Sequence, residues 1–153
     1  MKKIGVISDT HDVLRDDVRE ILKTCDAVIH AGDITTETVL EELRRMGSIY
    51  AVRGNNDRKL RKTLNQILRF EIEDVHFFMT HDRRNVSRRL DGVDVVIFGH
   101  SHKYFQEMVD GRLWLNPGSC GRPRFGGALS MAVMQVSQGH YQVEKIPLDT
   151  SRG

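Results

Sequence analysis

Seven side chains that can bind a metal ion follow segments with the pattern of β-strands. They comprise four imidazoles, two carboxylates and one amide: Asp9, His11, Asp33, Asn55, His81, His100 and His102. Ligands of open α/β sheets bind beyond the carboxyl ends of the strands, so we expect these groups to converge on one edge. Oxygen and imidazole ligands without cysteine suit a divalent cation of borderline to hard character. The sequence therefore predicts a metal centre.

Seven ligands are too many for one ion, whereas two ions that share a carboxylate would account for them. Two metals about 3.5–4 Å apart can clamp an in-line displacement at phosphorus. A water that bridges them becomes hydroxide near neutral pH, because each cation withdraws charge from it. With this hydroxide and the carboxylates of Asp9 and Asp33, two dications would leave a charge of about +1, which attracts a phosphate anion.

Each motif has a simpler explanation when it stands alone. Asp9-Thr10-His11 is typical of a turn or a helix cap, Gly32-Asp33 is ordinary turn chemistry, and Asp57 could cap a following helix. The histidines of His100-Ser101-His102 could pack in a core. Their joint occurrence in this order, each motif after a strand, favours the metal centre.

The segments that must position these ligands alternate between strand and helix patterns over the first two thirds of the chain. Strands are expected at 3–8, 27–30, 48–53 and 93–98, and helices at 14–22, 39–46, 60–64 and, with a basic face, 83–90. Hairpins are expected from the pairs 67–72 with 75–80, 104–109 with 112–116, and 128–136 with 141–146. This order predicts an α/β protein, with one mixed sheet or with two sheets packed face to face and helices outside.

Composition narrows the class of protein further. The chain has 153 residues, which is typical of a single domain spanning 1–153. Its net charge of +2 does not favour a dedicated nucleic-acid binder. Its apolar runs are far shorter than the roughly 18 residues of a membrane span. Cys25 and Cys120 stand far apart without a CxxC motif, which is typical of reduced thiols in a cytoplasmic protein.

The set of motifs resembles the calcineurin-like metallophosphoesterase superfamily, in particular its small one-domain phosphodiesterases of bacteria and archaea. The superfamily pattern is D-x-H, G-D, G-N-H-D/E, a lone H and G-H-x-H, and the small members share an N-P-G-S loop, here Asn116-Pro117-Gly118-Ser119. The resemblance implies a four-layer α/β/β/α sandwich of two mixed sheets with flanking helices. It also implies a dinuclear-metal-dependent phosphodiesterase that hydrolyses phosphoester bonds by attack of a metal-bridging hydroxide.

The resemblance also implies which residues hold each metal. Three ligands belong to each ion and Asp33 bridges them, with Asp9, His11 and His102 on the first metal and Asn55, His81 and His100 on the second. Family members commonly use manganese, and iron, nickel, zinc or cobalt can substitute.

Two positions depart from the superfamily pattern. Asn56 stands where many members have a histidine that contacts phosphate, and an amide donates hydrogen bonds but cannot deliver a proton. We expect Asn56 to be a catalytic, substrate-binding residue that stabilises the phosphate, with weak protonation of the leaving group. The alternative is that Asn56 only helps to form the loop.

The second departure follows His81, where Asp82-Arg83 replaces the usual Gly-His. We expect this change to affect substrate preference rather than metal binding.

Arginines near the site are candidates for binding the substrate phosphate. Arg83 belongs to the basic face expected at 83–90, and Arg124 follows the Asn-Pro-Gly-Ser loop. A guanidinium can bind phosphate through two parallel hydrogen bonds. The alternative for the basic cluster is a solvated surface.

The favoured function is a metal-dependent phosphoric ester hydrolase that acts on a small phosphodiester. The alternatives are a phosphomonoesterase or a nuclease of the same superfamily, and a non-catalytic scaffold that resembles the retromer small subunit. Nuclease activity is disfavoured because the sequence shows no extra domain or long basic stretch. Neither nucleic acid nor a membrane is an expected partner, and a homo-oligomer is left open.

Overall fold

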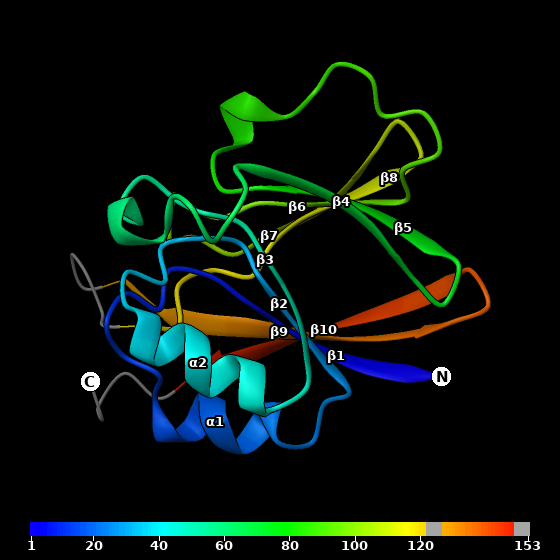
Figure 1. The fold of residues 1–153 in the computed structure, drawn as a ribbon. Coiled ribbons are helices and arrows are strands. Elements are labelled where there is room, and N and C mark those ends of the chain that lie inside the picture. Colours follow the sequence, from blue (N-terminus) through cyan, green and yellow to red (C-terminus); the bar gives the residue numbers. More distant parts are fainter. Residues whose placement is uncertain (122–126, 149–153) are drawn as a thin grey trace.

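The computed structural model describes residues 1–121 and 127–148, which form two five-stranded sheets packed face to face (Figure 1). The first sheet has the order β10-β9-β1-β2-β3 and contains β1 (Lys2–Ile7), β2 (Ala27–His30), β3 (Ser48–Ala51), β9 (Leu129–Ser137) and β10 (His140–Leu148). The second has the order β4-β5-β6-β8-β7 and contains β4 (Ile67–Ile72), β5 (Val75–Thr80), β6 (Val95–Ile97), β7 (Phe105–Val109) and β8 (Arg112–Asn116).

Both sheets are mixed, which confirms the α/β class with two mixed sheets expected from the sequence; α-helices of the described residues cover only the first sheet. Strands β1, β2 and β3 run parallel, as do β5, β6 and β8, whereas the other neighbours pair antiparallel. The three predicted hairpins are present as β4–β5, β7–β8 and β9–β10. Because the parallel strands of a sheet end at a common edge, the loops after β1, β2, β3, β5 and β6 can bring the predicted ligands together.

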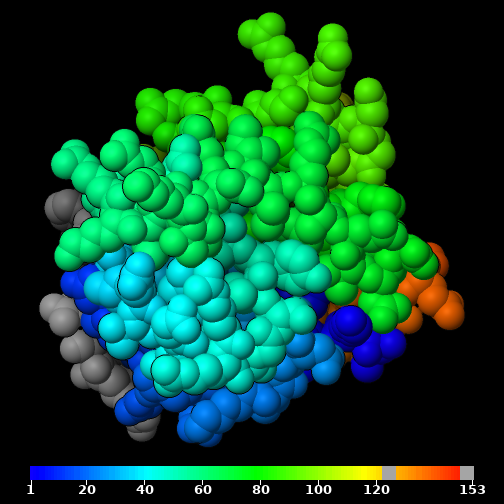
Figure 2. Space-filling view, in the orientation of Figure 1, coloured from blue at the N-terminus to red at the C-terminus, as the bar shows by residue number. Residues whose placement is uncertain are grey.

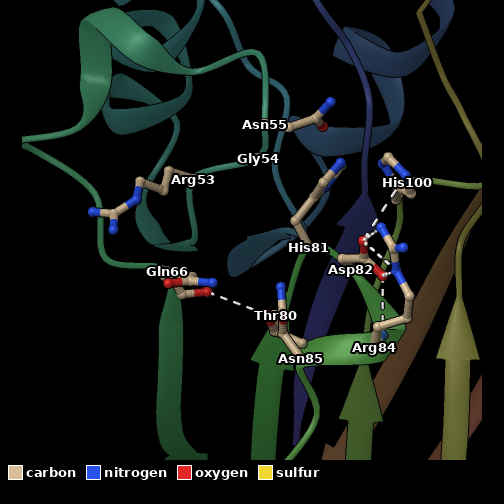
Figure 3. A pocket seen from close by; sticks show the side chains of 10 residues that line it. All are labelled: Arg53, Gly54, Asn55, Gln66, Thr80, His81, Asp82, Arg84, Asn85 and His100. Atoms are coloured by element: carbon tan, nitrogen blue, oxygen red, sulfur yellow. Dashed lines mark hydrogen bonds and ion pairs between the residues drawn. The ribbon is translucent and has the colours of Figure 1, made fainter.

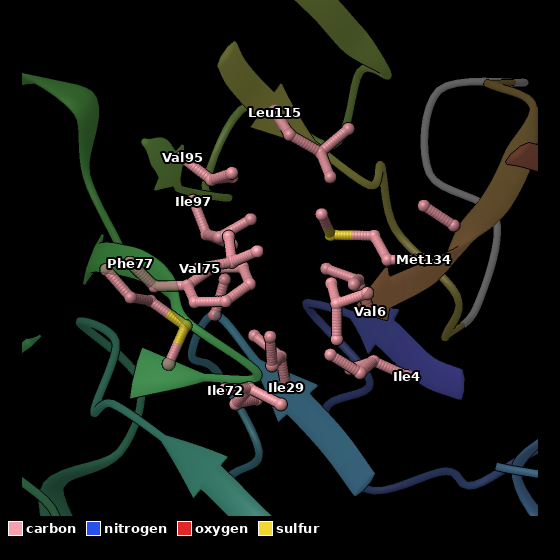
Figure 4. Packing of buried hydrophobic residues seen from close by; sticks show 14 of the residues in the cluster. Ile4, Val6, Ile29, Ile72, Val75, Phe77, Val95, Ile97, Leu115 and Met134 are labelled. Atoms are coloured by element: carbon pink, nitrogen blue, oxygen red, sulfur yellow. The ribbon is translucent and has the colours of Figure 1, made fainter. Parts of the chain in front are cut away.

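Alternation along the strands divides the apolar side chains between the two faces of each sheet. In β1, Ile4 and Val6 lie in the core between the sheets, while Ile7 packs on the helix side. In β5, Phe77 lies in the same central core and Phe78 on the opposite face. Figure 4 shows residues of both sheets meeting in this core. Each fully buried side chain of this kind contributes about 1.5–3 kcal/mol, so the core fixes the two sheets against each other.

Two helices cover the outer face of the first sheet, α1 (Asp16–Leu22) and α2 (Glu37–Arg45) (Figure 1). Leu22 and Leu40 are buried in the cluster between these helices and the sheet. The hydroxyl of Thr36 accepts a hydrogen bond from the N–H of Val39, which satisfies a free donor at the start of α2. These two helices agree with the sequence prediction.

The outer face of the second sheet is covered by irregular chain. The helix predicted at 83–90 is wrong, because only η2 (Arg83–Asn85), a turn of 3₁₀ helix, forms there. Val86 and Leu90 instead pack against the cluster that contains Phe78. This tertiary burial outweighs the helix preference of the arginines between them.

The helix predicted at 60–64 is also wrong in position and type, since η1 covers Arg58–Leu60 as a 3₁₀ turn. Within the described ranges, no helix is long and apolar enough to cross a membrane.

The visible surface in Figure 2 divides into two halves. Residues from the start of the chain, in blue and cyan, cover one half, and residues from the middle of the chain, in green, cover the other. A site made from both sets of loops must therefore form where the two halves meet.

Candidate metal centre

The loops that follow β1, β2, β5 and β6 are joined by hydrogen bonds at one edge of the sandwich. The N–H of Asp9 donates to the carbonyl of Gly32 over 2.9 Å, and the N–H of Gly99 donates to the carbonyl of His81 over 2.9 Å. The N–H of His100 donates to Oδ2 of Asp9 over 3.2 Å, which connects a loop of the second sheet with a loop of the first. The predicted convergence of these loops is thus present in the structure.

Two groups of side chains are close enough to hold a cation, and both contain Asp9: Asp9 with His11 and His102, and Asp9 with Asp33 and His81. Nε2 of His102 lies 3.3 Å from Oδ1 of Asp9. Nε2 of His81 lies 3.3 Å from Oδ2 of Asp33 and 3.7 Å from Oδ1 of Asp9. The three residues of the second group are 0–4% exposed, and we call them the buried floor.

Two atoms of the buried floor lack the hydrogen bonds that buried polar atoms normally make. Oδ1 of Asp9 and Nε2 of His81 are buried and have no hydrogen-bond partner within the described residues. The other atoms of these side chains are engaged, since Oδ2 of Asp9 accepts from the hydroxyl of Ser8 over 2.7 Å and Nδ1 of His81 donates to the carbonyl of Ala31 over 2.8 Å. Each side chain keeps one atom for a shared space, an arrangement that fits a divalent cation.

The charges of the floor keep both carboxylates ionised. Burial opposes ionisation of Asp33, but the charge of the neighbouring His81 and hydrogen bonds from Asn56 hold its pKa below the usual range. Burial acts in the same sense on Asp9, whose pKa is nonetheless lowered, chiefly by His102 and His81. Burial lowers the pKa of His81, yet the two carboxylates outweigh this effect and raise it to about 9. A proton on His81 thus supplies positive charge that a bound metal would replace.

Five of the seven predicted ligands have a left-handed backbone, with φ of 55° at Asp9, 52° at His11, 62° at Asp33, 74° at His100 and 63° at His102. Residues other than glycine rarely adopt this conformation. It costs on the order of 1–3 kcal/mol at each position and persists only where the surrounding structure fixes it. Strain of this kind clusters at functional sites, and here it coincides with the predicted ligands.

Asn55 and His100, the other two predicted ligands, line a pocket of about 370 Å³ beside His81 (Figure 3). Asn55 is exposed. The side chain of His100 is 42% exposed, and its Nε2 lies 4.0 Å from Oδ2 of Asp82. His100 belongs to neither of the two groups found in the described part of the chain. We call Asn55 and His100 the exposed rim of the centre.

The loop after β3 is attached to the floor through Asp33. The side-chain amide of Asn56 donates to Oδ2 of Asp33 over 3.0 Å, and its backbone N–H donates to Oδ1 over 3.0 Å. Asp57, which the sequence suggested only as a helix cap, accepts from the N–H groups of Asp33, Thr35 and Gly54 over 2.6–2.8 Å. Its place at the end of the Gly-Asn-Asn-Asp motif was the only signal for this role.

The structure places Arg83 away from the pocket. Its guanidinium lies 4.9 Å from the ring centroid of Phe105 and 5.0 Å from that of Trp114, on the outer face of the second sheet. The next residue, Arg84, lines the pocket instead. Arg124, the other arginine suggested for substrate binding, lies outside the described residues.

His30 connects the loops after β1 and β2 from a fully buried position. Its Nδ1 accepts from the N–H of Gly32 over 3.0 Å, so its Nε2 carries the proton and donates to the hydroxyl of Thr10 over 2.9 Å. Burial lowers the pKa of His30 to about 3, which keeps the ring neutral. His30 therefore braces the segments next to Asp9 and Asp33 without adding charge.

Comparisons with known proteins agree with this geometry. The sequence profile described as the calcineurin-like phosphoesterase superfamily domain matches residues 1–139. Phosphodiesterase MJ0936 of Methanocaldococcus jannaschii is 35% identical, over 77% of this chain and 84% of that protein. A solved structure described as a novel archaeal phosphodiesterase has a TM-score of 0.75 at 29% identity, over 95% of this chain and 99% of that chain.

Another solved structure, Vps29 from Entamoeba histolytica complexed with Zn²⁺, has a TM-score of 0.72 at 19% identity, over 96% of this chain and 99% of that chain. At this identity the likeness shows the fold alone. The profile match covers most of the chain and includes every predicted ligand. The chain belongs to the calcineurin-like phosphoesterase superfamily.

Proposed function

We propose that this protein is a metal-dependent phosphodiesterase that acts on a small phosphodiester. The observation that carries the proposal is the buried floor, where one atom of Asp9 and one of His81 lie 3.7 Å apart and make no hydrogen bond to the described part of the chain. The superfamily match and the similarity to an archaeal phosphodiesterase support hydrolysis of phosphoric esters. The match over residues 1–139 also supports one domain spanning 1–153.

The cofactor in this proposal is a pair of divalent cations, with manganese first and iron, nickel, zinc or cobalt as alternatives. The proposed ligands are Asp9, His11 and His102 for one ion, Asn55, His81 and His100 for the other, and Asp33 as the bridge. When bound, such cations lower the pKa of water and withdraw charge from phosphate oxygens. Two groups of candidate ligands support a paired site; they share Asp9, whereas the family resemblance makes Asp33 the bridge.

The remaining residues of the site hold and orient these groups. Asn56 keeps Asp33 in place through two hydrogen bonds, and we propose that its amide also contacts the substrate phosphate. It cannot deliver a proton, so we expect substrates with good leaving groups to be favoured. The pocket beside the rim would take an ester group, with Arg84 rather than Arg83 at its wall.

Hydrolysis of bis(p-nitrophenyl) phosphate with added Mn²⁺ tests the function. We expect turnover by the wild type and a loss of roughly a thousand-fold in Asp33→Asn. Asp91→Asn, which alters an exposed carboxylate, should keep full activity. A scaffold that keeps the ligands could also take up metal, so turnover rather than metal uptake is the readout. Equal, low rates in wild type and Asp33→Asn would contradict the proposal.

Two further expectations complete it. A phosphomonoesterase would prefer p-nitrophenyl phosphate to the diester, so the ratio of the two rates separates these activities.

Cys25 and Cys120 are both free thiols, which supports the cytoplasmic location expected from the sequence. The oligomeric state stays a prediction without a test in the geometry.

A further inference from the structure

The loop Asn116-Pro117-Gly118-Ser119 follows β8 and has no part in the function proposed above. Its backbone and side chains are held tightly, since the hydroxyl of Ser130 on β9 donates to the carbonyl of Pro117 over 2.8 Å. The N–H of Ser130 donates to the carbonyl of Ser119 over 3.0 Å. The loop is therefore fixed to the first sheet, although it begins at a strand of the second.

Asn116 is fully buried and uses both ends of its amide. Its Nδ2 donates to the carbonyl of Gly99 and to the hydroxyl of Ser101, each over 3.1 Å. Its Oδ1 accepts from the N–H of Gly118 over 2.9 Å. The two donors thus contact the residues directly before and after His100, whose φ of 74° lies in the left-handed region.

Ser119 makes the corresponding contact with the floor. Its hydroxyl donates to the carbonyl of Asp9 over 3.2 Å and accepts from the N–H of Gly121 over 3.4 Å. The N–H of the next residue, Cys120, donates to the carbonyl of Ser8 over 3.2 Å. Asp9 also has a left-handed φ, of 55°. One short loop therefore holds a strained residue of the rim and a strained residue of the floor.

We propose that Asn116 and Ser119 are positioning residues that set the place of His100 relative to Asp9 and thereby decide whether two metal ions bind together. The carbonyls and hydroxyl that they engage come from loops of different sheets, so no contact within one loop could replace them. The hydrogen bond of 3.2 Å from His100 N–H to Asp9 Oδ2 depends on this placement. This proposal depends on the proposed function in one respect, namely that the centre binds metal ions.

The test is the binding of Mn²⁺ by the purified protein, measured by calorimetry and by elemental analysis after dialysis. Asn116→Asp keeps the shape of the side chain but replaces both donors with an oxygen. We expect the second Mn²⁺ to bind about 10–100-fold more weakly, as is typical when a residue that orients metal ligands is lost. Ser119→Ala should weaken binding of the second Mn²⁺ by a smaller factor. Ser119→Thr keeps the hydroxyl and should bind Mn²⁺ with nearly the affinity of the wild type.

Ser130→Ala is the matched control, because it removes a buried hydrogen bond from the same loop without touching Gly99, Ser101 or Asp9. We expect a lower Tm and wild-type affinity for Mn²⁺. If Asn116→Asp does not fold, Ser101→Ala removes one partner of Asn116 at an exposed position and should still weaken binding of the second Mn²⁺ in calorimetry.

Wild-type affinity for both ions in Asn116→Asp, or in Ser101→Ala where that variant stands in for it, would overturn the proposal. A wild-type protein that binds a single Mn²⁺ would overturn it as well. A wild type that binds two ions and hydrolyses no diester would refute the phosphodiesterase function and leave the positioning role to be judged by the binding data, so the two failures are distinguishable.

Discussion

The floor and the rim of the metal centre are built in different ways. Asp9, Asp33 and His81 are buried at the ends of strands and are oriented by backbone and side-chain neighbours. Asn55 and His100 lie on exposed turns, and His100 is directed toward Asp82. The folded chain thus orients the floor through its own hydrogen bonds, whereas the side chains of the rim are open to solvent.

This difference predicts different consequences of mutation. A change in the floor removes charge from a site of low solvent exposure, where each electrostatic interaction is strong. A change in the rim removes one ligand that water can partly replace. We therefore expect floor variants to abolish function and rim variants to weaken it in a way that excess metal corrects.

Asp9→Asn should have the largest effect, because Asp9 belongs to both candidate groups. We expect kcat/KM for bis(p-nitrophenyl) phosphate to fall by roughly a thousand-fold or more, even at saturating Mn²⁺. Circular dichroism should show an intact fold. A loss of less than about ten-fold would show that the floor is not the centre of the reaction.

Gly54→Ala should damage both parts, since Gly54 precedes Asn55 and touches Asp33. An added Cβ would lie 2.1 Å from Oδ1 of Asp33 and 2.6 Å from its backbone nitrogen. We expect about 1–3 kcal/mol of destabilisation and roughly hundred-fold weaker Mn²⁺ binding, measured by thermal unfolding and calorimetry.

Gly92→Ala is the control for this substitution, because no atom lies within 4 Å of its added Cβ. Its φ of 76° adds backbone strain, so stability should fall while Mn²⁺ binding stays at the wild-type level. Equal loss of metal binding in both variants would show a general effect of instability.

His100→Ala tests the rim. We expect the second Mn²⁺ to bind about 10–100-fold more weakly, with much of the activity recovered at high Mn²⁺. The measurement is activity against Mn²⁺ concentration. A loss as complete as in Asp9→Asn, without recovery, would remove the distinction between floor and rim.

Asn56→His sharpens the comparison at the residue that bonds to the floor and faces the solvent. An imidazole can donate a proton to the leaving group, and such help is worth roughly 10²–10⁴-fold. We expect the wild type to depend steeply on leaving-group pKa across aryl and alkyl phosphodiesters, and the variant less so. A shallow dependence in the wild type would contradict the role given to Asn56.

The smallest effect is expected from the thiols. Cys120 packs next to the floor, and burial raises its pKa to about 12; burial also raises the pKa of the half-buried Cys25. Iodoacetamide should therefore modify Cys120 roughly a thousand-fold more slowly than in the unfolded chain, with activity unchanged. Rapid labelling of Cys120, followed by mass spectrometry, would show that the edge beside the floor opens.

The order of strands and the residues that follow them could be predicted from the sequence. Short apolar runs bounded by turn residues, as in β1 and β5, are local information, and so is the position of Asp9 or His81 shortly after a strand. Because ligands bind beyond the carboxyl ends of strands, the seven predicted ligands were expected at one edge, and the family resemblance then assigned them to two metals. The structure brings five of them into two groups there, with Asn55 and His100 in the adjoining pocket.

Other features depend on partners far away in the chain. The segment 83–90 is irregular because it packs on the second sheet, and Arg83 points outward because Phe105 and Trp114 lie beside it. Likewise, Asn116 positions a residue 16 places earlier. Composition and spacing carry no record of such contacts.

The sequence by itself determined which chemical groups are available and that each stands at the end of a strand, because strand patterning and turn residues act over a few neighbours. Only the tertiary structure decided which groups are buried without partners and which are exposed. The burial of Asp9 and the backbone strain at Asp9 and His100 arise from the packing of one sheet's loops against the other's, and this packing exists only after both sheets have formed.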